Sequence, residues 1–230
     1  QAQLSVDTLS VGTYGITAEY GGATNYAPST GTLAGDQTVD PAVTTTTLGT
    51  SGSPSTYGAL VTFTATVVSG AGTPTGSVQF KVEGVNLETP VALDGSGQAQ
   101  LSVDTLSVGT YGITAEYGGA TNYAPSTGTL AGDQDVNPAP TTTTITADAP
   151  DPSVVDEVVT VTFTVTSAAG TPTGNVTVSD GAGTECTESV AVGQCNLTFT
   201  TAGAKILTAT YAGGGNFAGS VSVTEAHAVN

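Results

Sequence analysis

The stretch VTVTFTVT at residues 159–166 decides the fold class. In it, Val159, Val161, Phe163 and Val165 alternate with a threonine at every second position. Successive side chains of a β-strand point to opposite faces of a sheet, so this period of two predicts one apolar face and one hydroxyl-bearing face. The stretch is therefore predicted to be a strand that buries one of its faces.

The same alternation appears upstream, where VTFTATV at 61–67 again places apolar side chains on one face. Turn-forming segments rich in Gly, Pro and Asp separate the alternating runs, and no window has a helical period. In the best-defined part of the chain, strands are predicted at residues 42–48, 59–68, 76–82, 87–93, 98–104, 110–117 and 127–136. Seven short alternating strands in a segment of this length are typical of an immunoglobulin-like β-sandwich.

The chain also repeats itself. Residues 1–37 recur without a change at 98–134, and TPTG occurs at both 73–76 and 171–174. A more diverged match relates YGITAEYGGATNY in the second copy to KILTATYAGGGNF near the C-terminus. Internal similarity at a fixed spacing indicates tandem units. We expect the C-terminal half of a unit, a complete unit and a diverged complete unit, at 1–40, 41–137 and 138–230.

The order of motifs resembles a known family. TTTT is followed by VTFTATV, then by TPTG before SVQF, and then by TYGITAEYGG and TNY; the third unit has the same order with VTVTFTVT, TPTG and NVTV. This order is similar to that of the bacterial Ig-like domains found in large surface repeat proteins. The resemblance implies an all-β fold of tandem Ig-like sandwiches outside the cell. It also implies a role as spacer, stalk, filament subunit or binding tip, with no catalytic motif.

Charge excludes several kinds of partner. The 230 residues carry 19 acids against two lysines, for a formal net charge of −17. No basic patch can form to neutralise phosphates, so nucleic acid and anionic lipid are excluded as partners. No apolar run approaches the about 18 residues of a membrane-spanning helix, so no membrane insertion is expected. The missing initiator Met suggests a processed or excerpted chain.

Two cysteines, Cys186 and Cys195, are predicted to form a disulfide. Cys195 aligns with Ala99, which is predicted to face inward. The spacing suits two neighbouring antiparallel strands and their turn, whereas a redox pair needs CxxC and zinc needs four ligands. A disulfide indicates an oxidising compartment, and the expected location is extracellular, at the cell surface.

Candidates for chemistry are few. His227 is the only histidine, and no nucleophile-elbow motif accompanies it, so no catalytic residue is predicted. We interpret the acids at the junctions between units as solvated turn residues. The alternative is calcium held by Asp133 and Asp135, and no other cofactor is expected. Asn175 and Asn196 lie in N-x-T sequons and are candidate glycosylation sites.

The leading hypothesis is a non-enzymatic segment or subunit of an extracellular stalk or filament. Its partners would be other copies of the chain or of the same repeat. Residues 1–37 contain only the last three strands predicted for a unit and would leave an apolar face open. Either the chain is a window from a longer repeat protein, or strands of a neighbouring copy complete the half-unit. The alternatives are an adhesin that binds a surface or glycan ligand through loops of its last unit, and an accessory region of a secreted enzyme.

Overall fold

The computed structural model describes all of residues 1–230 and contains strands without helices, which confirms the all-β prediction. Packing groups the chain into two compact bodies, whose bounds differ from those of the repeat units predicted from the sequence. The first comprises Gln1–Thr50, Phe63–Leu101 and Gly112–Gly132; the second comprises Ser51–Thr62, Ser102–Tyr111 and Asp133–Asn230. No helix is long and apolar enough to cross a bilayer.

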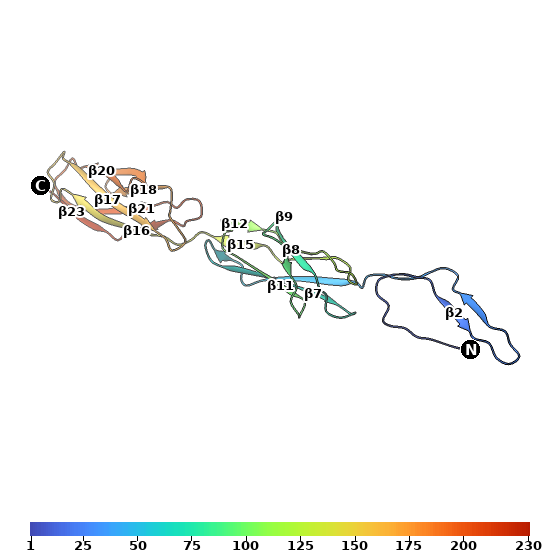
Figure 1. Cartoon of the computed structure of the whole chain (residues 1–230). Coiled ribbons are helices and arrows are strands. Elements are labelled where there is room, and N and C mark those ends of the chain that lie inside the picture. The colour runs from blue at the N-terminus through green and yellow to red at the C-terminus, as the bar shows by residue number, and fades with distance from the viewer. The chain divides into compact units, whose positions relative to one another are not determined.

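The first body contains four short strands within residues 1–40, followed by the main strands of residues 41–137. Figure 1 shows its strands β2, β7 and β8. Its strands are β1 (Gly12–Tyr14), β2 (Thr17–Tyr20), β3 (Ser29–Thr32), β4 (Gln37–Val39), β5 (Thr44–Thr50), β7 (Val61–Ser69, whose first two residues belong to the second body), β8 (Ser77–Val82), β9 (Val85–Asn86), β10 (Val91–Ala92), β11 (Gln98–Val103, whose last two residues belong to the second body), β13 (Ile113–Tyr117) and β14 (Ser126–Thr129).

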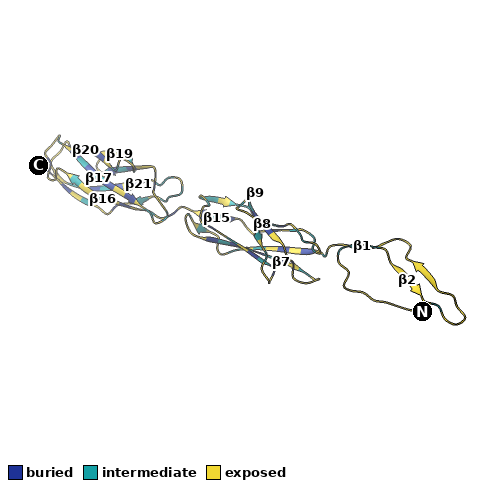
Figure 2. Ribbon diagram, in the orientation of Figure 1, coloured by how far each residue is buried: buried dark blue, intermediate teal, exposed yellow.

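Two sheets enclose a core in residues 41–137. One has the order β11-β7-β5, and the other has the order β10-β8-β13-β14 with β9 paired to β8. The alternation on β7 buries Val61, Phe63, Ala65 and Val67, because every second side chain faces the opposite sheet. Tyr117 on β13 is buried in the same core, and Figure 2 shows the dark inner positions of these strands.

The second body contains the strands β6 (Ser55–Thr56), β12 (Gly109–Tyr111), β15 (Gln134–Asn137), β16 (Thr142–Ala149), β17 (Val158–Thr166), β18 (Asn175–Ser179), β19 (Glu185–Ser189), β20 (Gln194–Thr198), β21 (Gly203–Tyr211), β22 (Ser220–Val221) and β23 (Glu225–Val229). Sheet β16-β17-β20 faces sheet β19-β18-β21-β22, and β23 pairs with the first half of β21. The side chains of Val161, Phe163, Val178, Leu197 and Tyr211 meet in the core between these sheets.

Three of the predicted strands differ from the observed ones. The strand predicted at 87–93 is reduced to Val91–Ala92, the one at 110–117 is interrupted at Gly112, and the one at 127–136 is two strands. The first two breaks have a visible cause. Glu88 has a positive φ of 56°, which ends extended structure, and the backbone N–H of Gly112 donates to the Glu83 side chain instead of to a neighbouring strand.

Residues 1–40 also depart from the prediction of three strands. The local pairs are made: β1 pairs with β4 and β2 with β3, in the registers of their copies β12–β15 and β13–β14. The sequence QAQLSV, however, forms β11 at 98–103 and no strand at 1–6. A strand needs a partner for its backbone groups, and only the second copy has β7 beside it.

Candidate functional sites

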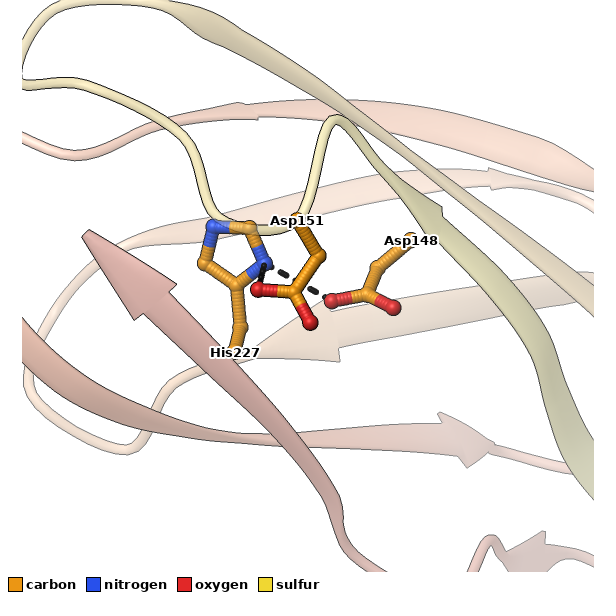
Figure 3. A group of neighbouring side chains, drawn as sticks. All are labelled: Asp148, Asp151 and His227. Carbon is orange, nitrogen blue, oxygen red and sulfur yellow. Dashed lines mark hydrogen bonds and ion pairs between the residues drawn. The ribbon is translucent and has the colours of Figure 1, made fainter. Parts of the chain in front are cut away.

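His227 lies at the centre of a buried polar cluster. It is on β23, and its side chain is fully buried. Its Nδ1 lies 2.7 Å from Asp148 Oδ2 on β16 and 3.5 Å from Asp151 Oδ1. Dashed lines mark both contacts in Figure 3. His227 Nε2 lies 2.9 Å from Ser153 Oγ, and the ring stacks on Phe199 with the centroids 5.2 Å apart. Hydrogen bonds thus connect Ser153 to His227 and His227 to Asp148, as they connect the serine, histidine and aspartate of a hydrolase triad.

The serine of this cluster has no access to a substrate. Ser153 is fully buried. Its backbone N–H donates to the carbonyl of Ala228, and its carbonyl accepts from the backbone N–H of Asn230. A nucleophile must reach the reacting atom of a substrate, which a fully buried hydroxyl does not do. The arrangement therefore supports a structural role for His227.

An equivalent contact in residues 41–137 supports the same conclusion. Gln134 is buried on β15, and its Nε2 lies 3.3 Å from Ser55 Oγ and donates to the carbonyl of Gly52 at 3.0 Å. Ser55 pairs with Val136 as Ser153 pairs with Val229, so Gln134 and His227 occupy the same position. An amide cannot act as a general base, so what the two residues share is that each joins a loop to the last strand of its unit. We call this contact the loop latch.

The His227 cluster also offers three ligand atoms for a metal. Those of Asp148, Asp151 and His227 lie within 4.8 Å of one another. Ligand atoms around a tetrahedral zinc with bonds of 2.0–2.1 Å lie about 3.3 Å apart. The 2.7 Å between His227 Nδ1 and Asp148 Oδ2 is shorter and is a normal hydrogen-bond distance. The geometry is that of a hydrogen-bonded pair.

The calcium candidates Asp133 and Asp135 flank Gln134. Asp135 Oδ1 accepts a hydrogen bond of 2.6 Å from Thr110 Oγ1, and the Asp133 carbonyl accepts one from Ser53 Oγ. The structure brings no third acidic or histidine side chain to them. Calcium binding at these two residues stays a prediction.

Cys186 and Cys195 form the predicted disulfide, with their Cα atoms 6.0 Å apart. The spacing was interpreted as two neighbouring antiparallel strands and their turn, and the structure shows that these two strands belong to different sheets. Cys186 is on β19, which pairs with β18, whereas Cys195 is on β20, which pairs with β17. The chain crosses from one sheet to the other in the turn between β19 and β20. The bond is therefore a covalent link between the two sheets around a shared core.

The two sequons lie on exposed strand positions. Asn175 begins β18, and Asn196 lies on β20 between two buried residues. Asn196 Oδ1 accepts a hydrogen bond of 2.9 Å from Thr160 Oγ1. Both side chains point away from the core, and glycosylation at either stays a prediction.

Residues 1–40 contain a second candidate site, an open apolar face. Ile16 is 42% exposed, whereas its copy Ile113 is 0% exposed. Tyr20 is 47% exposed against 1% for its copy Tyr117. The two copies have the same sequence, so the difference comes only from what covers them. Figure 2 shows β2 as exposed, in yellow.

The open face is hollow. A groove of about 570 Å³ is lined by Leu4, Val6, Asp7, Leu9, Ile16, Gln37 and Val39. The copies of four of these residues are Val103, Asp104, Leu106 and Val136, and in that copy Ser55–Val61 lies against them and leaves no space for a water molecule. The groove is thus the place that this segment fills in a complete unit.

Family comparison explains the tandem sandwiches. The model of the bacterial Ig-like domain (group 3) matches residues 46–137 and again residues 143–230. The chain belongs to the bacterial Ig-like domain family. The earlier resemblance is thereby confirmed, as is the Ig-like sandwich fold. No curated protein sequence matches the chain.

Solved structures share the Ig-like fold. The crystal structure of a tetra-tandem repeat in the extending region of a large adhesion protein matches with a TM-score of 0.52 and 16% identity, covering 100% of this chain and 60% of that chain. The fibronectin(III)-like modules of Clostridium thermocellum CbhA match with a TM-score of 0.34 and 16% identity, covering 79% and 92%. Yersinia pseudotuberculosis adhesin InvE matches with a TM-score of 0.40 and 16% identity, covering 80% and 58%. At 16% identity, the likeness to the tetra-tandem repeat is one of fold.

The loop latch is the feature of the Ig-like units that sequence reasoning missed. One signal for it is present: Pro54-Ser55 and Pro152-Ser153 occupy the same place before the second long strand. Its partner, glutamine in one unit and histidine in the other, differs in chemistry, so repetition alone does not reveal it. The tyrosine corner, in contrast, is recognisable in the sequence at Tyr14 and Tyr111, and in the structure the Tyr111 hydroxyl donates to the carbonyl of Ser107 at 3.0 Å.

Proposed function

We propose that the chain is a non-enzymatic structural segment of an extracellular stalk or filament built from tandem Ig-like domains. The observation that carries the proposal is the pair of consecutive family matches, with only residues 138–142 between them. The family and the fold shared with a large adhesion protein support an extracellular structural or adhesive role. The segment or subunit role is the more specific part of the proposal.

In this proposal the segment consists of the C-terminal half of one repeat unit at 1–40 and two complete units at 41–137 and 138–230. The link between the last two is short: β15 ends at Asn137, and β16 begins at Thr142. Pro138 and Pro140 lie in this link. A proline fixes its own φ and restricts the residue before it, so the link has little conformational freedom. Short, proline-containing links suit a spacer whose task is to hold distance.

The surface chemistry agrees with repeated copies outside a cell. The net charge of −17 makes copies repel one another and keeps them soluble when they are crowded. The disulfide between Cys186 and Cys195 favours an oxidising compartment. Neither nucleic acid nor membrane insertion enters the proposal.

The last unit carries the observation that favours the adhesive alternative. A hollow of about 360 Å³ lies over the disulfide and is lined by Cys186, Thr187, Glu188, Val192, Gln194, Cys195 and Asn196. Polar groups in a concave site are the features that orient a bound ligand. A glycan array probed with the whole chain tests this alternative. Binding that is lost in Gln194→Ala would favour an adhesin, and an array without signal would count against it.

An antibody against residues 138–230 tests the structural proposal on the cells that make the protein. It is expected to label intact cells along beaded surface projections in negative-stain images. Labelling that requires cell lysis would contradict the proposal. A second antibody, against a protein known to be cytoplasmic, serves as the control for cell lysis.

A further inference from the structure

Two asparagines occupy the same position in a loop of consecutive repeat units. Asn122 is the third residue of the turn at 120–123, and Asn216 is the third residue of the turn at 214–217. Each turn is closed by a bridge between its first and last residues. The turns read ATNY and GGNF, so the asparagine is the only residue that they share. The same kind of turn thus presents the same side chain in two diverged units.

Asn216 connects its own unit to the link and to the unit before it. Its backbone carbonyl accepts a hydrogen bond of 2.8 Å from the N–H of Ala139, which lies in the proline-containing link. Its side-chain Oδ1 accepts one of 2.9 Å from the backbone N–H of Val108, in unit 41–137. All three residues belong to the second body. One residue therefore holds both the link and a backbone group of the preceding unit.

Asn122 makes the same two contacts within the first body. Its backbone carbonyl accepts a hydrogen bond of 2.9 Å from the N–H of Ala42, and its Oδ1 accepts one of 3.2 Å from the N–H of Val11. Val11 and Val108 occupy the same position of the repeated sequence. The contact therefore occurs twice, at equivalent positions, in two separate bodies. We call it the unit joint.

Two further contacts pack the joint at Asn216 closely. The ring of Tyr57 meets that of Phe217 edge-on, with the centroids 5.7 Å apart and the planes at 79°. A Cβ built on Gly58 would lie 2.9 Å from the Cβ of Ala169, which is closer than the carbon atoms of neighbouring side chains approach each other. Only a residue without a side chain therefore fits beside Ala169 at this position.

Unit 138–230 has a different residue at the position of Gly58. Gly58 and Asp156 each lie three residues after the serine of a Pro-Ser pair. Both have a positive φ, of 78° and 64°, so the backbone is alike and the side chain is what differs. Asp156 carries a carboxylate where Gly58 leaves room for Ala169. The face that accepts a following unit in this way is thus present in unit 41–137 and absent from unit 138–230.

We propose that Asn122 and Asn216 fix the orientation of a repeat unit relative to the unit before it. Tyr57, Gly58 and the N–H of Val108 form the receiving face at the second joint, and the partner that fits this face is a unit with an Asn-aromatic turn. Units of one chain move relative to one another unless their interface restrains them. Here a directed hydrogen bond and a close steric fit both restrain that motion. The inference rests on the proposed function, to which it adds the device that keeps consecutive units in a fixed orientation.

Residual dipolar couplings of the whole isotopically labelled chain test the proposal, because they report the orientation of each unit in one common frame. A single alignment tensor is expected to describe units 41–137 and 138–230 of the parent. Asn216→Leu removes the acceptor at a similar side-chain size, and the two units are expected to lose their common tensor. Asn216→Asp keeps an oxygen acceptor and is expected to retain it. Agreement of the couplings within each unit shows that a variant is still folded.

Gly58→Asp introduces at the joint the residue that unit 138–230 has in this position. The common tensor is expected to be lost, since the new side chain meets Ala169. Gly132→Asp is the matched control. Gly132 also has a left-handed backbone, with a φ of 83°, but nothing lies within 4 Å of a Cβ built on it. This variant is expected to keep the common tensor of the parent.

Separate tensors for the two units of the parent would overturn the proposal. A common tensor in Asn216→Leu or in Gly58→Asp would do the same, as would its loss in Asn216→Asp or Gly132→Asp. Loss of the common tensor on addition of EDTA would also overturn it, because a bound cation would then hold the units. Surface labelling of cells reads the location of the chain and not the restraint between its units. The proposed function and this inference can therefore fail separately.

Discussion

Gln134 and His227 occupy the same position on the last strands of two Ig-like units, and each places a side-chain nitrogen on the serine of a Pro-Ser pair. The distances are 3.3 Å from Gln134 Nε2 to Ser55 Oγ and 2.9 Å from His227 Nε2 to Ser153 Oγ. The loop latch therefore tolerates two side chains of different acid–base chemistry. This equivalence explains why a Ser-His-Asp arrangement occurs in a domain where it has a structural role.

The loop latch predicts how replacements of His227 rank. His227→Ala leaves Ser153 and Asp148 without their partner and opens a cavity, so it is expected to lower the free energy of unfolding by about 2–4 kcal/mol. His227→Gln is expected to recover at least half of that loss, because glutamine does the same task in the neighbouring unit. Denaturant unfolding followed by circular dichroism measures both. Equal losses in the two variants would refute the equivalence.

The burial of Ser153 predicts that the Ser-His-Asp cluster is unreactive. A fluorophosphonate, which labels activated serines, is expected to leave the folded chain unmodified, because the reagent cannot reach a fully buried hydroxyl. Mass spectrometry of the treated chain reads the result. Labelling at Ser153 that His227→Gln abolishes would show that the cluster is a working nucleophile.

Removal of the disulfide is expected to affect one Ig-like unit only. Closing so short a loop lowers the entropy of the unfolded chain, which in the chain-entropy model stabilises the folded state by about 2–3 kcal/mol. The double variant Cys186→Ser, Cys195→Ser should lose about that amount in the unfolding transition of residues 138–230. The transition of residues 41–137 should stay in place, and calorimetry can follow both. A shift of both transitions would mean that the units do not unfold independently.

Asp94 predicts part of the pH dependence of stability. The pKa of its carboxyl is lowered by hydrogen bonds from the backbone N–H of Gln98, from the Ser96 hydroxyl and from the Ser96 N–H. A group with a lowered pKa adds stability above its unfolded value, here near 3.8, and that stability is lost as the pH falls through the folded value.

The test for Asp94 is a comparison across pH. Asp94→Asn should be less stable than the parent at pH 7, and the two should converge as the pH falls below 3.8 toward the folded pKa. Denaturation midpoints at a series of pH values measure the difference. A gap that stays constant down to low pH would mean that the charge of Asp94 is not the cause.

Sequence patterns predicted most of the fold because the deciding signals are local. The alternation of Val159, Val161, Phe163 and Val165 needs no partner to be recognised, and all four are buried. The spacing of Cys186 and Cys195 predicted their disulfide but not their sheets, because spacing cannot tell a hairpin from a crossing between sheets. Pairing across the sequence is what a local pattern leaves open.

The candidate sites were less predictable, because they depend on contacts between distant residues. His227 meets Asp148 across 79 positions of sequence, and no motif connects them. Residues 1–6 and 98–103 also show that local sequence does not determine pairing. The same six residues form a strand at 98–103, where β7 lies beside them, and no strand at 1–6. No reading of QAQLSV itself could separate them.

Limited proteolysis tests the central claim most directly, namely that these Ig-like units are parts of an extracellular assembly in which every unit is complete. In the isolated chain, cleavage is expected first within residues 1–40, while residues 41–230 resist. In material on the surface of intact cells, the account predicts that the region around Ile16 resists cleavage as well as the region around Ile113. Equal early cleavage around Ile16 in both preparations would contradict it.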